Sequence, residues 1–327
     1  MAATTSEPSR ALLCSEWTLA QALDPIGTAG DYAGYLLVEW PLPWPRDAGE
    51  IEELAPLRPL LAAARHRLQL MASPPGEELH RVIRYGNAAG EVFRGFSAQT
   101  VRVGTAEVVD AAVALLGTDP AGRGGDGRDP ITAEGEAVTS PSAEHLVLVC
   151  THGRRDRCCG ARGTELALTL QSNLGQLGAG TSLARTSHTG GHRYAPTALV
   201  FPEGTAWAFA DIELLARVAG RVGPLDDLLP HYRGCTGVGS PELQALEREV
   251  LAEVGWELWD LPRFGEELGD GRVRLHVEGW TAGGGKGTWE ATVSQGRTMP
   301  MPACGGPADE PVTTAWESVV RDFVRVG

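Results

Sequence analysis

The sequence predicts an α/β fold built from two similar units and a smaller third region. Three observations support this. Short apolar runs suited to buried strands alternate with helical stretches in both halves of the chain. These elements follow the same order in both halves. A segment rich in Gly, Pro, Asp and Thr, 117–143, separates the halves and is typical of a flexible linker.

The first unit is expected to span 12–116. It opens with the apolar run "AGYLLVEW", which predicts a buried strand, and continues through a loop rich in Pro and Trp, "PLPWPRD". Pro56 and Pro59 fall early enough in the next helix to disturb only its first turns. The expected elements are strands at 33–40, 68–72, 80–85 and 91–96 and helices at 50–65 and 105–116.

The second unit, expected at 144–229, repeats this order. It opens with the valine-rich run "HLVLVC", and Asp211 is a suitable N-cap for its last helix. The expected elements are strands at 145–150, 182–187, 197–202 and 205–211 and helices at 161–174 and 211–222. A thioredoxin-like unit has this order of elements: a strand, a helix, three strands and a helix. We therefore expect that fold in both halves.

The region 230–327 has a different character. A helix is expected over 240–255, where Ser240 is the N-cap, Pro241 takes the first helical position and Gly255 ends the helix. Two alternating stretches flank the glycine-rich "TAGGGKG" and predict a hairpin. We therefore expect a small α+β region at the C-terminal end.

The chain carries a formal net charge of −14. Binding to nucleic-acid phosphates needs a basic face, so we expect no nucleic-acid partner. The acidity can serve solubility, or it can provide a docking face for a basic redox partner. Composition leaves both open.

The chain is expected to be cytoplasmic and free of the membrane. No stretch approaches the roughly 18 consecutive apolar residues of a transmembrane helix. The start, "MAATTSEPSR", lacks the basic and apolar parts of a secretory signal. Thiols stay reduced in the cytosol, so clustered cysteines there indicate metal or redox chemistry rather than disulfides.

Three of the six cysteines lie in "CTHGRRDRCCG", residues 150–160. Cys150 ends the expected strand and Cys159 directly precedes a glycine and a helix. A thiolate at a helix N-terminus is stabilised by the free N–H groups. The eight residues between these two cysteines are too many for a zinc knuckle. The remaining cysteines, Cys14, Cys235 and Cys304, are isolated and expected to be buried or idle thiols.

Two histidines, His188 and His192, bracket "TGG" further along the chain. The glycine pair favours a tight loop in which both imidazoles converge. Together with Cys150 and Cys159 they make a set of two thiolates and two imidazoles, which suits zinc or an iron–sulfur cluster. The residues alone leave that choice open.

Three segments resemble the sucrase/ferredoxin-like family of thioredoxin-like ferredoxins. They are residues 150–160, "RTSHTGGHRYAPTALVFPEGTAWA" (185–208) and "PIGTAGDYAGYLLVEWPLPWP" (25–45). The resemblance covers about 12–222. It implies one [2Fe–2S] cluster with one iron on two cysteines and the other on two histidines. Carried over by position, the ligands are Cys150, Cys159, His188 and His192.

The position of Cys158 is usually not cysteine in the family, so we expect it to be a bystander thiol. Four further residues are expected to surround the ligands: His152, Arg155, Asp156 and Arg185. They would orient the ligands or offset the charge of the cluster. The first half lacks equivalent ligands, so we expect a cluster-free copy that serves as a packing or docking platform.

The resemblance implies an electron-transfer protein with a redox partner protein, rather than an enzyme with its own substrate. Two alternatives remain. One is a structural zinc protein that uses the same two cysteines and two histidines. The other is a thiol redox protein that uses Cys158 and Cys159.

We expect electron uptake to be coupled to proton uptake. A ligating imidazole keeps a second ring nitrogen, and reduction of a cluster would raise the pKa of that nitrogen. Over the pH range where His188 or His192 titrates, the midpoint potential should fall by about 59 mV per pH unit, the slope for one proton per electron. Voltammetry from about pH 5 to 10 measures this slope. A midpoint potential that is constant throughout would contradict the coupling.

Overall fold

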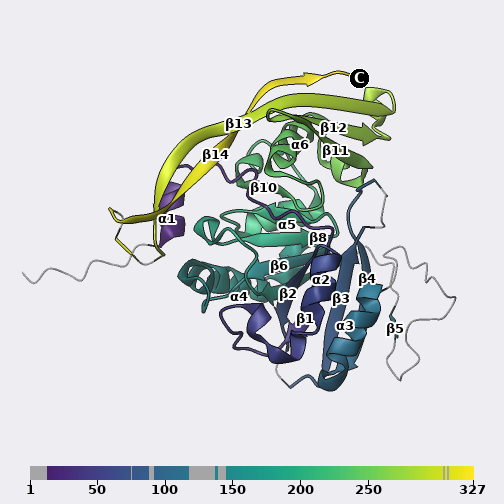
Figure 1. Ribbon diagram of the computed structural model, residues 1–327, viewed down its shortest axis with the longest axis vertical. Coiled ribbons are helices and arrows are strands. Elements are labelled where there is room, and N and C mark those ends of the chain that lie inside the picture. Colours follow the sequence, from purple (N-terminus) through teal and green to yellow (C-terminus); the bar gives the residue numbers. More distant parts are fainter. Residues whose placement is uncertain are drawn as a thin grey trace, which may run out of the picture.

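The protein is described by a computed structural model that covers residues 13–74, 76–87, 92–117, 137–138, 145–304, 306–307 and 309–327. It contains a ten-stranded sheet and a four-stranded sheet (Figure 1). The strands of the large sheet are β1 (Gly34–Trp40), β2 (His66–Ala72), β3 (Leu79–Gly86), β4 (Ser97–Gly104), β5 (Ala137–Val138), β6 (His145–Cys150), β7 (Thr181–Thr186), β8 (Ala198–Phe201), β9 (Thr205–Trp207) and β10 (Tyr232–Cys235).

The small sheet is entirely antiparallel. Its strands are β11 (Arg263–Gly269), β12 (Arg272–Glu278), β13 (Lys286–Pro302) and β14 (Pro311–Arg325). The α-helices are α1 (Cys14–Ala20), α2 (Leu57–Ala63), α3 (Val108–Gly117), α4 (Thr164–Ser172), α5 (Ile212–Gly220) and α6 (Pro241–Val254). Among the described residues, no helix is long and apolar enough to cross a membrane.

The expected duplication is confirmed by the strand order. The first half has the order β2–β1–β3–β4 and the second half has β7–β6–β8–β9, with one parallel pair at the start of each. Strands β2 and β7 join the halves as an antiparallel pair, in which Met71 faces Thr186. The two thioredoxin-like units therefore share one continuous sheet. The expected linker, 117–143, lies almost wholly outside the described residues.

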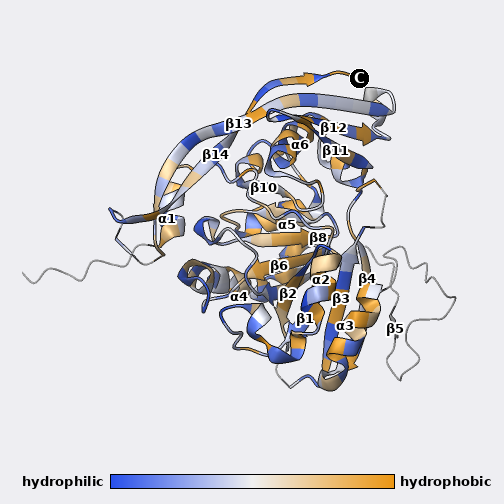
Figure 2. Ribbon diagram, in the orientation of Figure 1, coloured by the Kyte–Doolittle hydropathy of each residue, from blue (hydrophilic) through white to orange (hydrophobic). Residues whose placement is uncertain are grey.

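Strand β6 forms the centre of the second unit. All its residues after His145 are buried, and it lies between β7 and β8. A strand covered on both faces needs an apolar run rather than an alternating one, which explains "HLVLVC". Figure 2 shows the same hydrophobic colouring in β6 and β8. The buried strand carries Cys150 at its end.

One expected strand, 91–96, is wrong. Within 92–96 only Phe93 pairs, in an isolated bridge to Arg263. Gly95 has a φ of +101°, which no extended strand adopts. The place of that strand is taken by β4, whose polar start conceals its alternation.

The expected helix at 50–65 begins later, at Leu57. Two short 3₁₀ turns, Ala48–Glu50 and Glu52–Leu54, precede it. Proline lacks an N–H group and its ring clashes with a preceding carbonyl, so it is tolerated only in the first turn of a helix. This places the helix start beside Pro56, with Pro59 in the first turn.

The C-terminal region contains the expected helix and hairpin. Ser240 caps α6 by accepting from the N–H of Leu243, and β12 pairs with β13. Strands β11 and β14 were not expected. Together β13 and β14 form a long arm that reaches back to α1 (Figure 1). Met299 and Met301 of this arm pack against Tyr194 of the second unit.

A buried ion pair joins this region to the large sheet. Glu247 of α6 accepts from Arg263 Nε at 2.8 Å and from the Tyr232 hydroxyl at 2.8 Å. Both charged side chains are fully buried. Removing one partner of such a pair leaves an uncompensated buried charge.

We expect Glu247→Ala to lower the free energy of unfolding by about 3–5 kcal/mol, because Arg263 would lose its counter-charge. Urea denaturation followed by tryptophan fluorescence measures the loss. The matched control is Asp227→Ala, which breaks the exposed pair with Arg217 and should leave stability almost unchanged. If both variants lost the same free energy of unfolding, the buried ion pair would stabilise the fold no more than the exposed one.

Candidate metal centre

Two groups of metal-ligating side chains lie next to each other beyond the end of β6. The first group is Cys150, Cys159 and His188, and the second is Cys14, Cys158, His192 and Cys304; within each group the ligand atoms all lie within 4.8 Å of one another. None of these cysteines forms a disulfide, and the five thiols pack in one cluster with Ala195. Each group could bind a metal ion.

Cys150 is fixed by the sheet, and Cys159 by the helical turn that follows the loop. Cys150 N–H donates to Thr197 O at 3.0 Å. Residues Cys159–Gly163 form a π-helical turn that leads into α4. A Cβ at Gly163 would lie 1.9 Å from the carbonyl oxygen of Cys150, so only glycine allows this approach. The close packing brings the two buried thiols together.

The two histidines lie on the expected tight loop. Gly190 and Gly191 have φ values of +83° and +68°, in the left-handed region that glycine enters readily. A Cβ at Gly191 would lie 2.5 Å from the guanidinium of Arg233. The glycine pair thus turns the chain tightly beneath Arg233 and places His188 and His192 on either side of the turn.

Asp156 connects the two imidazoles. Its carboxylate lies 3.0 Å from His188 Nδ1 and 3.7 Å from His192 Nδ1. Burial alone would raise the pKa of Asp156, but its contact with His188 and the charge of His192 outweigh burial and lower that pKa. Burial would lower the pKa of His188, but Asp156 and Cys150 raise it above its ordinary value. The carboxylate therefore orients both rings electrostatically.

Within each group the thiols hydrogen-bond to one another and shift one another's pKa values. A hydrogen bond from Cys159 lowers the pKa of Cys150 well below the ordinary thiol value, while the same contact raises the pKa of Cys159. In the second group, contacts with Cys158 and Cys304 raise the pKa of His192 to about 9. Each group thus favours at least one thiolate, the form that binds metal.

Two of the other residues expected around the ligands, His152 and Arg155, connect the site to the first unit. His152 accepts from His188 N–H through Nδ1, and its Nε2 lies 2.7 Å from Pro45 O. Arg155 donates to Asp47 at 3.1 Å. Arg185 donates to the Thr151 hydroxyl at 3.4 Å. The Pro- and Trp-rich loop of the first unit therefore supports the cysteine loop of the second unit.

Cys14 and Cys304, expected to be isolated thiols, lie in the second group with Cys158. Cys14 begins α1, and Cys304 lies in the turn between β13 and β14. No local spacing indicates this contact, because 144 residues separate Cys14 from Cys158 and 146 separate Cys158 from Cys304. The expectation was wrong because only the fold brings these segments together.

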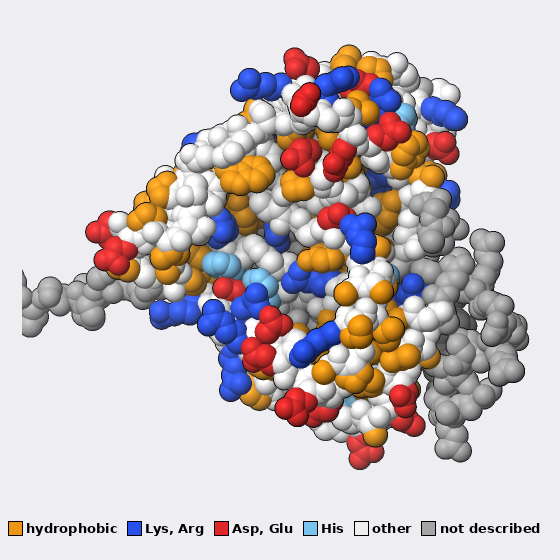
Figure 3. Space-filling model, viewed as in Figure 1, with side chains coloured by type: hydrophobic (Ala, Val, Ile, Leu, Met, Phe, Trp, Pro, Cys, Tyr) orange, Lys and Arg blue, Asp and Glu red, His pale blue; other side chains and the backbone are white. Residues whose placement is uncertain are grey.

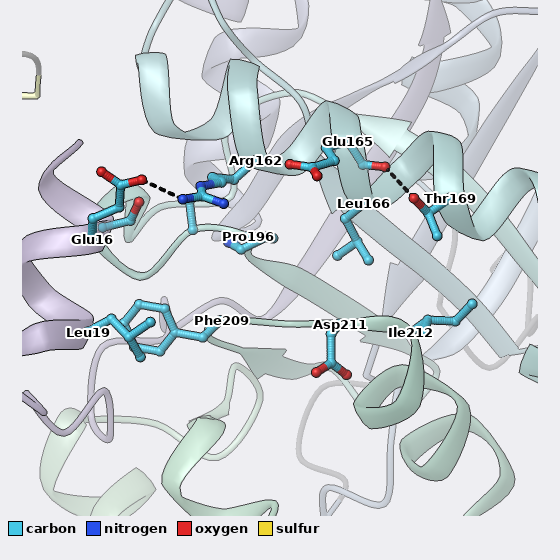
Figure 4. A pocket seen from close by; sticks show the side chains of 12 residues that line it. Glu16, Leu19, Arg162, Glu165, Leu166, Thr169, Pro196, Phe209, Asp211 and Ile212 are labelled. Atoms are coloured by element: carbon cyan, nitrogen blue, oxygen red, sulfur yellow. Dashed lines mark hydrogen bonds and ion pairs between the residues drawn. The ribbon is translucent and has the colours of Figure 1, made fainter. Parts of the chain in front are cut away.

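An ion pair between Glu16 and Arg162 holds α1 against the turn that follows Cys159. Figure 4 shows the two side chains pointing toward each other at the rim of a cavity of about 390 Å³ between α1, α4 and α5. This contact positions the start of α1, and hence Cys14, beside the cysteine loop.

A second cavity, of about 410 Å³, gives access to the site from outside; its lining residues are Arg46, Asp47, Glu50, Arg155, Asp156, His188 and His192. The side chains of His188 and His192 are 17% and 31% exposed, whereas the cysteines of the first group are buried. Figure 3 shows histidine side chains in a hollow with arginine and acidic side chains nearby. The imidazoles are therefore the outward side of the site.

Comparison with known proteins gives a family. The family model described as sucrase/ferredoxin-like matches residues 25–224. No curated protein and no solved structure matches the chain. The matched range covers well over half of the 327 residues and includes both thioredoxin-like units and the HTGGH loop. The chain therefore belongs to the sucrase/ferredoxin-like family.

Proposed function

We propose that the protein is an electron carrier with one [2Fe–2S] cluster, held by Cys150, Cys159, His188 and His192. The observation that carries this proposal is the convergence of three of these side chains within 4.8 Å, with the fourth facing the same Asp156 carboxylate. The family membership is in agreement with it.

The residues present fit such a group chemically. Two buried thiols and two partly exposed imidazoles supply the soft and borderline donors that iron–sulfur centres use. When bound, a [2Fe–2S] cluster accepts and releases one electron at a time. The thiols would bind one iron in an environment that excludes water, and the imidazoles would bind the other near the cavity.

Asp156 favours one ligand atom on His188. A metal-bound histidine commonly gives its other ring N–H to a carboxylate, which fixes the tautomer and the ring orientation. Since Nδ1 of His188 faces Asp156 at 3.0 Å, Nε2 is the nitrogen left for iron. The low pKa of Asp156 keeps the carboxylate ionised for this role.

The exposed imidazole side suggests where a redox partner would dock. The cavity that reaches both histidines has arginines and acidic residues at its rim. Mixed charges of this kind orient a protein partner more than they add to its affinity. A partner bound over the cavity would approach the cluster from the histidine side.

The arrangement of the vicinal cysteines argues against the thiol redox alternative. Cys158 lies with Cys14 and Cys304, whereas Cys159 lies with Cys150. The two adjacent thiols therefore belong to different groups rather than facing each other.

The test is the visible absorption spectrum, iron content and sulfide content of anaerobically purified protein. We expect charge-transfer bands, with about two iron ions and two sulfides per chain. A colourless protein with zinc bound at Cys150 and Cys159 would replace the proposal with the structural zinc alternative.

We expect Cys159→Ser to lose the visible bands and most of the iron, because a serine hydroxyl is a poor substitute for a thiolate. Cys158→Ser should keep nearly all of both, and Cys235→Ser, which changes a buried thiol outside both groups, is the matched control. Iron content and absorbance of the three variants measure this. The reverse order for Cys158 and Cys159 would contradict the ligand assignment.

We expect His188→Cys and His192→Cys to retain a cluster and to lower its midpoint potential on the order of 100 mV or more, because thiolates add negative charge. Protein-film voltammetry measures the potential, and electron paramagnetic resonance of the reduced protein reports on the ligands. An unchanged potential and spectrum in both variants would show that neither histidine binds iron.

A further inference from the structure

We propose that Cys14, Cys158 and Cys304 bind a second metal ion, a soft divalent cation such as Zn²⁺, beside the site of the cluster. This inference goes beyond the proposed electron transfer and does not depend on it. The three residues come from the start of α1, the cysteine loop and the turn of the β13–β14 arm.

The three thiols are already close to the geometry of a thiolate metal site. Cys158 Sγ lies 3.3 Å from Cys14 Sγ and 2.9 Å from Cys304 Sγ. These distances exceed the roughly 2.05 Å of a disulfide bond. Tetrahedral zinc with Zn–S bonds of about 2.3 Å holds sulfurs about 3.8 Å apart, so each pair needs to separate by about 1 Å or less.

The three thiols form a donor set that is mostly shielded from water. Cys14 and Cys158 are 1% and 0% exposed, and Cys304 is half-buried. A thiol loses its proton when it binds metal, and the buried negative charge of thiolates is costly unless it is paired. A divalent cation bound by thiolates would remove that cost.

The surrounding contacts pre-form the site from distant segments. Arg297 of the arm donates to the carbonyls of Gln21 and Ala22, just after α1, at 3.0 and 3.1 Å. Glu16 of α1 pairs with Arg162 behind the cysteine loop. These contacts hold α1, the loop and the arm together, so the metal would complete an arrangement that the fold already makes.

His192 lies between the two centres. Its Nδ1 is 3.2 Å from Cys14 Sγ, so it could fill the fourth position on the second ion. Three protein ligands with an open fourth position are also an established zinc arrangement. The proposal therefore requires only the three thiolates and leaves His192 for the cluster.

The test is the metal content of full-length protein expressed with zinc in the medium and purified anaerobically without chelators. We expect about one zinc per chain in addition to the iron. Cys14→Ser and Cys304→Ser should lose about ten-fold or more of the zinc while they keep the iron and the visible spectrum. Cys150→Ser should lose iron and keep zinc, and the matched control Cys235→Ser should keep both.

Zinc-edge X-ray absorption of the unmodified protein is the second measurement, in case a variant does not fold. We expect a sulfur shell at about 2.3 Å with about three sulfurs per zinc. Zinc far below one per chain, zinc without a sulfur shell, or loss of iron instead of zinc in Cys14→Ser would overturn the proposal. If zinc is retained and iron is absent in the unmodified protein, only the proposed cluster fails.

Discussion

The centre of this protein packs several thiols, two imidazoles and a carboxylate side by side. Such an arrangement is stable only where each buried charge has an opposite charge next to it. Five thiols form one cluster at the end of β6. Asp156 lies between the two histidine rings and has a lowered pKa because of them. Buried thiolates would be costly on their own, and each of the two donor groups could bind a metal ion. Four separate parts of the chain meet here: the start of α1, the cysteine loop, the HTGGH loop and the turn between β13 and β14.

The duplicated fold supplies the rigidity that such a site needs. The second unit carries the cysteine loop and the HTGGH loop, and the first unit carries, at the place equivalent to the cysteine loop, a loop rich in Pro and Trp. That loop supports the cysteine loop: Pro45 meets His152, Asp47 meets Arg155, and the Trp44 ring packs edge-on against the His152 imidazole. The first unit thus acts as a platform for the second, and the shared sheet keeps their spacing fixed.

Local patterns in the sequence predicted much of the fold and part of the site. An unbroken apolar run predicted β6, and a cap, a proline and a glycine predicted α6. Strand β4 was missed because its polar residues conceal the alternation of buried and exposed positions. Strand β14 was missed because no local pattern in the sequence identifies the partner of a long strand. The proximity of Cys150, Cys159 and His188 was predicted because these residues lie in two short motifs. Cys14 and Cys304 were missed because their proximity arises only when the arm folds back over α1.

The vicinal cysteines explain how one loop contributes to two groups of side chains that could each bind a metal ion. Cys158 has helical dihedral angles, and successive residues on a helix point about 100° apart. Adjacent thiols in this conformation face different directions, so one turn of backbone supplies Cys159 to the first group and Cys158 to the second. His192 lies at the same boundary, near Asp156 on one side and Cys14 on the other. The two groups share this turn, and His192 of the second group lies near Asp156, which also contacts His188 of the first. A change of charge in one group would therefore be felt in the other over a few ångströms of low-dielectric interior.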